Sequence, residues 1–335
     1  MSPTPTELAE EALKGSVRAL AKLITLVENE MSGSTEVLQK IYSRTGRAYT
    51  IGITGPPGSG KSTLTDKITQ EVRKRNLTVA VIAVDPTSPF SGGALLGDRL
   101  RMHDITSDEG VFVRSMATRG ALGGLSKATA DAIKILDAFG KDFILIETVG
   151  VGQDEVDIVR TADTTLLISV PGLGDDIQAM KAGIMEIGDI FVVNKADREG
   201  ADRVVTELSM MLDLSPSRSW RPPVVKTVGT LGTGIPELVE KIFEHRKFLE
   251  EGKGLKAKRN ERAREEIIRL IEQEISKYVH KMLKYDLNFE EVIDQVVARE
   301  QDPYSYARKV TEPFAQYYQI YKVDKIKAGG EKPGG

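Results

Sequence analysis

Hydrophobic positions near the start of the chain recur with the period of an α-helix. Between residues 5 and 30 the apolar positions are Leu8, Ala12, Leu13, Val17, Leu20, Ile24 and Val27. Spacings of three and four residues place such side chains on one face, so the pattern predicts an amphipathic helix over this stretch. A second, shorter helix is predicted over residues 35–43.

From about residue 48 the pattern changes to short apolar segments that are rich in β-branched residues. These segments are YTIGIT, TVAVIAVD, FILIET, TTLLISV, DIFVVN and PPVVKTV, and stretches of helical pattern separate them. Strands that alternate with helices are typical of a parallel sheet covered on both faces. We therefore predict an α/β fold with a mostly parallel central sheet flanked by helices, which closes near residue 250 with the helix IPELVEKIFEHRKFLE.

The pattern changes again after residue 250. The stretch EGKGLKAKRN is polar and basic and contains glycine, which indicates a linker or an exposed helix start. Residues 261–283 and 289–319 have helical periodicity, and the tail AGGEKPGG is too polar and glycine-rich to order itself. One apolar stripe in this region comprises Ile267, Ile268, Leu270, Ile271, Ile275 and Val279. We expect an N-terminal helical extension (1–47), an α/β domain (48–250), a C-terminal helical region (251–322) and a flexible tail (323–335).

Composition excludes several classes of function. The 335 residues include 46 basic and 49 acidic side chains, a balance that argues against general binding to nucleic acid or to a membrane surface. Because the chain has no cysteine, it has no disulfides, thiolate metal sites or cysteine nucleophile. No apolar run approaches the ~20 residues of a membrane span, and no signal peptide is evident, so we expect a cytoplasmic protein.

The segment GPPGSGKS, residues 55–62, follows a predicted strand and opens a predicted helix. It fits the phosphate-binding pattern G-x-x-x-x-G-K-[ST], in the strand-to-helix context that this pattern requires. Gly58 and Gly60 allow backbone N–H groups to surround phosphates at a helix N-terminus. We expect Lys61 to reach the β- and γ-phosphates and the Ser62 hydroxyl to bind Mg²⁺, which makes the α/β domain a P-loop NTPase.

Two other strands end in carboxylates. FILIETVG places Glu147 at the end of a strand that is otherwise apolar, and TVAVIAVD ends on Asp85. Ligands of open α/β sheets bind at the carboxyl ends of the strands, so we expect Glu147 to be partnered by Mg²⁺ there. Gly150 is positioned to offer its N–H to the γ-phosphate, and Asp98, in a long loop after Asp85, is a candidate for the Mg²⁺ shell.

The tetrapeptide NKAD, residues 194–197, predicts guanine as the base. The two carboxylate oxygens of Asp197 can accept from guanine N1–H and the 2-amino group together, a pairing that adenine cannot make. The aliphatic stem of Lys195 can cover the base, and Asn194 can tie the loops together. In a P-loop protein these residues favour GTP over ATP.

Five segments, in this order, resemble one protein family closely: GITGPPGSGKST, VDPTSPFSGGALLGDRLRM, ETVGVGQDE, PGLGDDIQAMKAG and NKAD. The family is the GTPase chaperones of methylmalonyl-CoA mutase, the MeaB type. The resemblance covers nearly the whole chain. It implies a G protein that guards the loading of adenosylcobalamin into a B12-dependent acyl-CoA mutase and rescues damaged cofactor, with the cofactor belonging to the mutase. It also implies a homodimer built through the C-terminal helices.

The resemblance assigns roles to individual residues. The phosphate and Mg²⁺ positions are Lys61, Ser62, Asp85, Asp98 and Glu147, and the base-reading positions are Asn194, Lys195 and Asp197. Further nucleotide contacts are expected from Gly55, Gly58, Ser59, Gly60, Thr63 and Gly150. The polar positions of a third switch, expected to join Lys61 in catalysis, are Asp175, Gln178 and Lys181.

This chain departs from related GTPases at two places. Val151 replaces the glutamine that follows the glycine in Ras-like switches, which implies slow intrinsic hydrolysis. Thr227 and Val228 stand where a serine and an alanine are common in the base-binding loop. We expect the mutase to clamp the third switch so that Lys181 reaches the transition state, because a supplied cation accelerates phosphoryl transfer by roughly 10³–10⁵.

Three alternatives remain open at this point. A nickel-insertion GTPase requires histidines or cysteines clustered at a metal-transfer site. The chain has no cysteine and its three histidines are far apart in sequence, which disfavours this alternative. A kinase or transport-linked ATPase is disfavoured by NKAD. A scaffold that does not hydrolyse nucleotide is disfavoured by the intact phosphate and Mg²⁺ residues.

Overall fold

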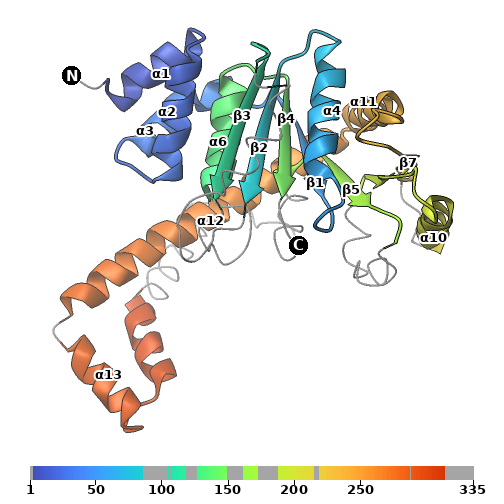
Figure 1. The fold of residues 1–335 in the computed structure, drawn as a ribbon. Coiled ribbons are helices and arrows are strands. Elements are labelled where there is room, and N and C mark those ends of the chain that lie inside the picture. The colour runs from blue at the N-terminus through green and yellow to red at the C-terminus, as the bar shows by residue number, and fades with distance from the viewer. Residues whose placement is uncertain are drawn as a thin grey trace, which may run out of the picture. The chain divides into compact units, whose positions relative to one another are not determined.

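The computed structural model describes residues 3–85, 105, 107–117, 127–148, 161–172, 188–214, 219–286 and 288–313. The chain divides into two compact units, Met1–Arg262 and Ala263–Gly335. Figure 1 shows the elements of both. The functional division expected from the sequence stays a prediction.

The first unit is built on a seven-stranded sheet in the order β3-β2-β4-β1-β5-β6-β7. Every pair of neighbouring strands is parallel, which confirms the predicted α/β class. The strands are β1 Tyr49–Thr54, β2 Val79–Asp85, β3 Val111–Ala117, β4 Phe143–Thr148, β5 Thr164–Ser169, β6 Ile190–Val193 and β7 Val224–Lys226. The central strand β1 lies between β4 and β5, so the loop that follows β1 is flanked by the ends of both neighbours.

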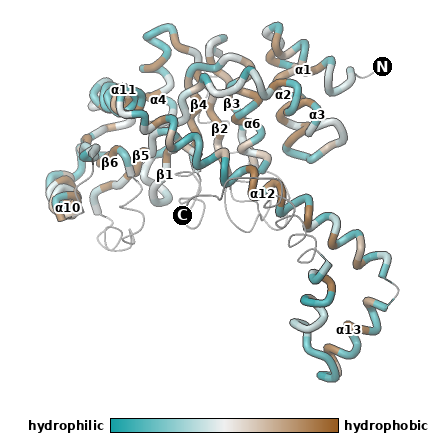
Figure 2. The backbone as a smooth tube through the Cα atoms, turned by 180° about the vertical axis from the view of Figure 1, so that it is seen from behind, coloured by the Kyte–Doolittle hydropathy of each residue, from teal (hydrophilic) through white to brown (hydrophobic). Residues whose placement is uncertain are grey.

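Helices cover both faces of the sheet. Helices α4 (Lys61–Arg73) and α11 (Ile235–Glu251) share one apolar core with Phe143 and Leu145 of β4. Helix α6 (Lys127–Ala138) shares the opposite core with Ile144 and Ile146. Alternate residues of a strand point to opposite faces, so β4 is apolar on both sides, and Figure 2 shows the resulting hydrophobic colouring of the strands.

The N-terminal region folds as three helices: α1 (Pro5–Leu13), α2 (Val17–Glu28) and α3 (Ser34–Ile41). The single helix predicted over residues 5–30 is therefore wrong. Gly15 has a φ of 101°, and Ser16 caps α2 by accepting from the Ala19 N–H at 3.2 Å. The apolar periodicity continues across Gly15 because α1 and α2 both bury their apolar faces in the same core as α6.

One strand of the sheet was not predicted from the sequence. Strand β3 carries Arg114 and Ser115 between apolar residues, which hides its strand pattern, although Phe112 and Met116 are buried. Helix α10 (Ala201–Leu214) packs Val204 and Leu208 against β5 and β6.

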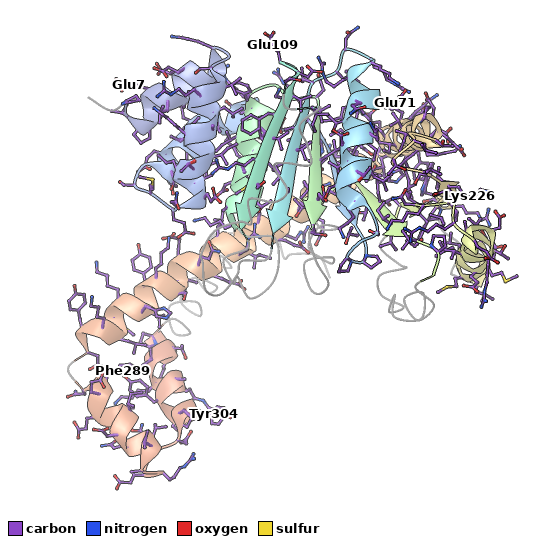
Figure 3. All side chains as sticks on the ribbon, in the orientation of Figure 1. Glu7, Glu71, Glu109, Lys226, Phe289 and Tyr304 are labelled. Atoms are coloured by element: carbon purple, nitrogen blue, oxygen red, sulfur yellow. The ribbon has the colours of Figure 1, made fainter. Side chains whose placement is uncertain are left out.

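The second unit is helical. Helix α12 (Gly254–Tyr285) begins in the first unit and continues into the second. Of the two alternatives predicted for the stretch EGKGLKAKRN, a linker or an exposed helix start, the structure shows the helix start. Helix α13 (Phe289–Val297) and a helix over residues 303–313 follow. Figure 3 labels Phe289 and Tyr304 among the side chains of this unit. Among the described residues, none of the helices combines the length and the hydrophobicity that a membrane span requires.

The first turns of α12 are attached where β1 and β5 begin. The buried Asp163 carboxylate accepts from the Thr50 N–H at 3.0 Å and from Arg259 Nη2 at 3.2 Å, and it also pairs with Arg262. Arg259 also donates to the Ala48 carbonyl at 2.9 Å. We call Asp163, Arg259 and Arg262 the Asp163 clamp. It fixes the start of α12 to the sheet edge opposite the carboxyl ends of the strands.

Candidate functional site

The P-loop joins β1 to α4 at the carboxyl edge of the sheet. Gly55, Gly58 and Gly60 have φ values of 148°, 75° and 87°, which side-chain-bearing residues rarely adopt. A Cβ atom on Gly55 would lie 2.3 Å from the Ile168 carbonyl oxygen, and one on Gly60 would lie 2.5 Å from Asn194 Nδ2. The glycines therefore let the loop backbone run directly against β5 and the NKAD loop.

Lys61 starts helix α4 and is buried by the loop that precedes it. Its ammonium group donates to the carbonyls of Gly55 at 2.7 Å and Pro56 at 3.0 Å. The first turn of α4 carries no acidic side chain. The helix N-terminus and the Lys61 ammonium group are both groups that favour phosphate.

Glu147 lies beside the P-loop serine. The alternation along β4 places Glu147 on the same face as Phe143 and Leu145, which is the face that α4 covers. The Ser62 hydroxyl donates to Glu147 Oε1 at 2.5 Å, and the Glu147 side chain is only 1% exposed. A buried carboxylate and a hydroxyl of the P-loop therefore meet at one point.

Asn194 connects three loops. Its amide Nδ2 donates to the Ser59 carbonyl at 2.7 Å, which ties β6 to the P-loop. Its Oδ1 accepts from Thr227 Oγ1 and from the Gly229 N–H, both at 3.1 Å. Thr227 stands where serine is common in the base-binding loop, and Gly229 was not among the predicted site residues. Their contacts with Asn194 span more than thirty residues, and no local motif marks them.

Lys195 and Asp197 follow on the same loop. Lys195 adopts a left-handed φ of 55°, and its ammonium group donates to the Gly58 carbonyl at 2.7 Å. The Ala196 N–H donates to the Thr227 carbonyl at 3.0 Å, which holds the loop against the one that follows β7. The Asp197 side chain is exposed and has no hydrogen-bond or ion-pair partner among the described residues. It is accessible to a ligand.

Several predicted site residues are not placed by the structure. Asp85 ends β2, beside β4, but its side chain lies outside what is described. Asp98, Gly150, Val151, Asp175, Gln178 and Lys181 all lie outside the described residues. Among the others, Ser59 is buried and Thr63 is exposed at the start of α4. Lys61, Ser62, Glu147, Asn194 and Lys195 are brought together around the P-loop, and their binding roles stay predictions.

Comparison with known proteins gives the family. Residues 20–284 match the family described as methylmalonyl Co-A mutase-associated GTPase MeaB. A putative GTPase of Pyrococcus horikoshii is 59% identical over 310 residues, which are 91% of this chain and 97% of that protein. A mitochondrial protein of Mus musculus, the methylmalonic aciduria type A homolog, is 36% identical over 254 residues, 70% of this chain and 61% of that protein.

Among solved structures, a LAO/AO transport system kinase superposes with a TM-score of 0.69 at 25% identity. The match covers 94% of this chain and 99% of that one. The P-loop NTPase fold predicted from the sequence is therefore confirmed. With the P-loop geometry above, these matches show that the chain is a GTPase that belongs to the MeaB family.

Proposed function

We propose that this GTPase is a chaperone of a B12-dependent acyl-CoA mutase of the methylmalonyl-CoA mutase type. In this role it gates the loading of adenosylcobalamin and protects or reactivates the mutase. The proposal is supported by the family description, which names association with that mutase, and by the name of the mouse relative. Adenosylcobalamin belongs to the mutase.

The hydrogen bonds of Asn194 are the structural observation that best supports binding of a guanine nucleotide. Through Ser59 and Gly229, Asn194 joins the phosphate loop to the loops expected to hold the base. Lys195 reinforces this link through Gly58. A guanine nucleotide bound with its phosphates on the P-loop and its base on Asp197 would therefore contact one connected scaffold.

The residues at the P-loop fit Mg²⁺. This ion prefers oxygen ligands and takes only one or two from the protein, together with phosphate oxygens and water. The Ser62 hydroxyl and the Glu147 carboxylate are oxygen donors already within 2.5 Å of each other. They would hold Mg²⁺, directly or through water, and Asp85 and Asp98 are further candidates. When bound, Mg²⁺ would neutralise part of the negative charge of the phosphates.

The experiment that tests the mutase role uses the full chain. Purified B12-dependent acyl-CoA mutases are offered as bait in GDP and in a non-hydrolysable GTP analogue, with a B12-independent acyl-CoA enzyme as the control. We expect capture by a mutase that depends on the nucleotide, and faster GTP hydrolysis in its presence. Equal capture by the control enzyme, or no effect of any mutase on hydrolysis, would contradict the proposal.

Lys181→Ala tests the third switch. If the mutase delivers the Lys181 charge to the transition state, the variant retains mutase binding and loses the stimulated part of GTP hydrolysis. Arg203, an exposed cation on α10 paired with Glu207, provides the control variant Arg203→Ala. Full stimulation of Lys181→Ala would assign the activating charge to another residue.

A further inference from the structure

A groove lies among the N-terminal helices, in a part of the chain that the nucleotide site does not use. It has a volume of about 600 Å³ and is lined by α1, α2, the turn after α2, and β3. Leu8, Leu26 and Met31 supply apolar lining. Met31 is 53% exposed, although its neighbours Leu8 and Leu26 are buried. An exposed thioether beside buried leucines leaves apolar surface open to a ligand.

Two cations border this groove without internal partners. Arg18 and Lys22 lie one turn apart on α2, both exposed, and neither forms a hydrogen bond or ion pair with any described residue. Two acidic residues of α1 form hydrogen bonds or ion pairs with residues other than Arg18 and Lys22. Glu7 caps its own helix through Thr4, and Glu10 pairs with Lys40. The groove thus keeps two uncompensated positive charges.

A third cation, Arg114 of β3, lies against the groove. Its Nη2 donates to Thr25 Oγ1 at 3.1 Å, and its guanidinium also pairs with Glu28, which balances its charge. Its Nε is buried and has no hydrogen-bond acceptor among the described residues. A buried donor without an acceptor costs about 1–3 kcal/mol. Because Glu28 balances the charge of Arg114, the free positive charge of the groove comes from Arg18 and Lys22.

We propose that this groove docks an amphipathic helix of a partner protein, with apolar side chains against Met31 and acidic side chains against Arg18 and Lys22. Arg18, Lys22 and Leu26 follow each other at intervals of four residues along one side of α2. This side is about 12 Å long at 1.5 Å per residue. Helices bind such grooves through anchors at the same intervals, and opposite charges at the rim set the orientation. The proposal does not depend on the identity of the mutase.

The test uses the full chain and two labelled peptides of 16 residues, both helical and amphipathic. One carries leucine on one face and glutamate on the other, and the second has lysine in place of every glutamate. We expect fluorescence anisotropy to show binding of the acidic peptide, weakening with added salt, and no binding of the basic one. Arg18→Glu combined with Lys22→Glu should lower affinity for the acidic peptide by about tenfold or more, equivalent to 1.4 kcal/mol.

Lys14→Glu combined with Arg44→Glu is the matched control. It makes the same change of charge on exposed residues of the same helical region, outside the groove lining. Met31→Ser tests the apolar contribution and should also weaken binding. Circular dichroism checks that each variant folds. Equal loss of binding in the control pair, or unchanged binding after the Arg18 and Lys22 substitutions, overturns the proposal. Competitive displacement of the peptide by decanoate would identify a small-molecule site and overturn it as well.

Discussion

Asp197 is the residue from which base selectivity is expected, and its side chain is exposed and unpartnered among the described residues. Asp197→Asn replaces one carboxylate acceptor with a donor. We therefore expect weaker GTP binding and a relative gain for xanthosine triphosphate, whose 2-position is a carbonyl. Hydrogen bonds to a charged group are worth about 1.5–3 kcal/mol, so the loss for GTP should be tenfold or more. Calorimetric titration of both nucleotides measures this, and unchanged GTP affinity would remove the assignment.

Asn194 acts on the same nucleotide in a different way, because it holds the loops rather than the base. Asn194→Ala leaves the Ser59 carbonyl and the Gly229 N–H without their partner. We expect affinity for GDP and GTP to fall by at least tenfold, and the free energy of unfolding to fall by about 2–3 kcal/mol.

Asn29→Ala is the control for this experiment. Its amide donates to the Thr25 carbonyl at 2.9 Å at the exposed end of α2, remote in sequence from every predicted nucleotide residue. Nucleotide titration and urea unfolding of both variants measure the two effects. An Asn194→Ala protein that binds GDP as the Asn29→Ala protein does would show that the loop ties are dispensable.

At the scale of elements, the Asp163 clamp makes the stability of the fold depend on pH. The groups around Asp163 determine the direction of this dependence. Burial raises the pKa of the Asp163 carboxyl, but the charges of Arg262 and Arg259 and the Thr50 N–H lower it more, so its pKa lies below the ordinary value. The carboxylate therefore stabilises the fold above its unfolded pKa of about 4, and this contribution is lost as the pH falls through the lower folded pKa.

Asp163→Asn tests this effect. Breaking a buried ion pair costs about 3–5 kcal/mol, so the variant should lose several kcal/mol of unfolding free energy at pH 7. The difference from the parent protein should shrink below pH 4. Asp202→Asn, which removes a surface partner of Lys226, should change stability little. Urea unfolding at pH 7, 5 and 3 gives the comparison, and identical behaviour of the two variants would contradict it.

The same scale shows what the sequence can and cannot predict. The P-loop and the NKAD loop are local patterns whose geometry depends on adjacent residues, so Gly58, Gly60 and Asn194 were found from spacing alone. Gly229 contributes a backbone N–H to a partner thirty-five residues away, and no side-chain pattern encodes such a contact. The helix break at Gly15 was missed because the apolar period continues across it.

At the scale of the whole molecule, the second unit carries the apolar stripe expected to form a dimer. Ile267, Ile271 and Ile275 recur every four residues on α12 and are 57%, 53% and 47% exposed in the single chain. Such a stripe is typical of a protein interface, and a symmetric dimer would bury it. Ile271→Glu should therefore give a monomer in light scattering at micromolar concentration, with GTP affinity unchanged.

Arg269→Glu places the same glutamate on the opposite side of α12 and should leave the dimer intact. If both variants remain dimeric, the interface lies elsewhere in the chain. If the parent protein is itself monomeric, the dimer prediction is wrong.

The Asp163 clamp also limits where the chain can be cut to produce a GTPase fragment. A fragment that stops at residue 250, where the α/β pattern ends, would keep Asp163 but discard the two arginines that neutralise it. In such a fragment the Asp163 carboxylate would be buried without a compensating positive charge. The fragment would fold only if this carboxylate were protonated or hydrated, and it would otherwise aggregate. We therefore expect the smallest autonomous GTPase fragment to extend through Arg262. Chimaeras that exchange the helical unit between relatives should place their junction after this residue, so that each GTPase module retains its own pair of arginines.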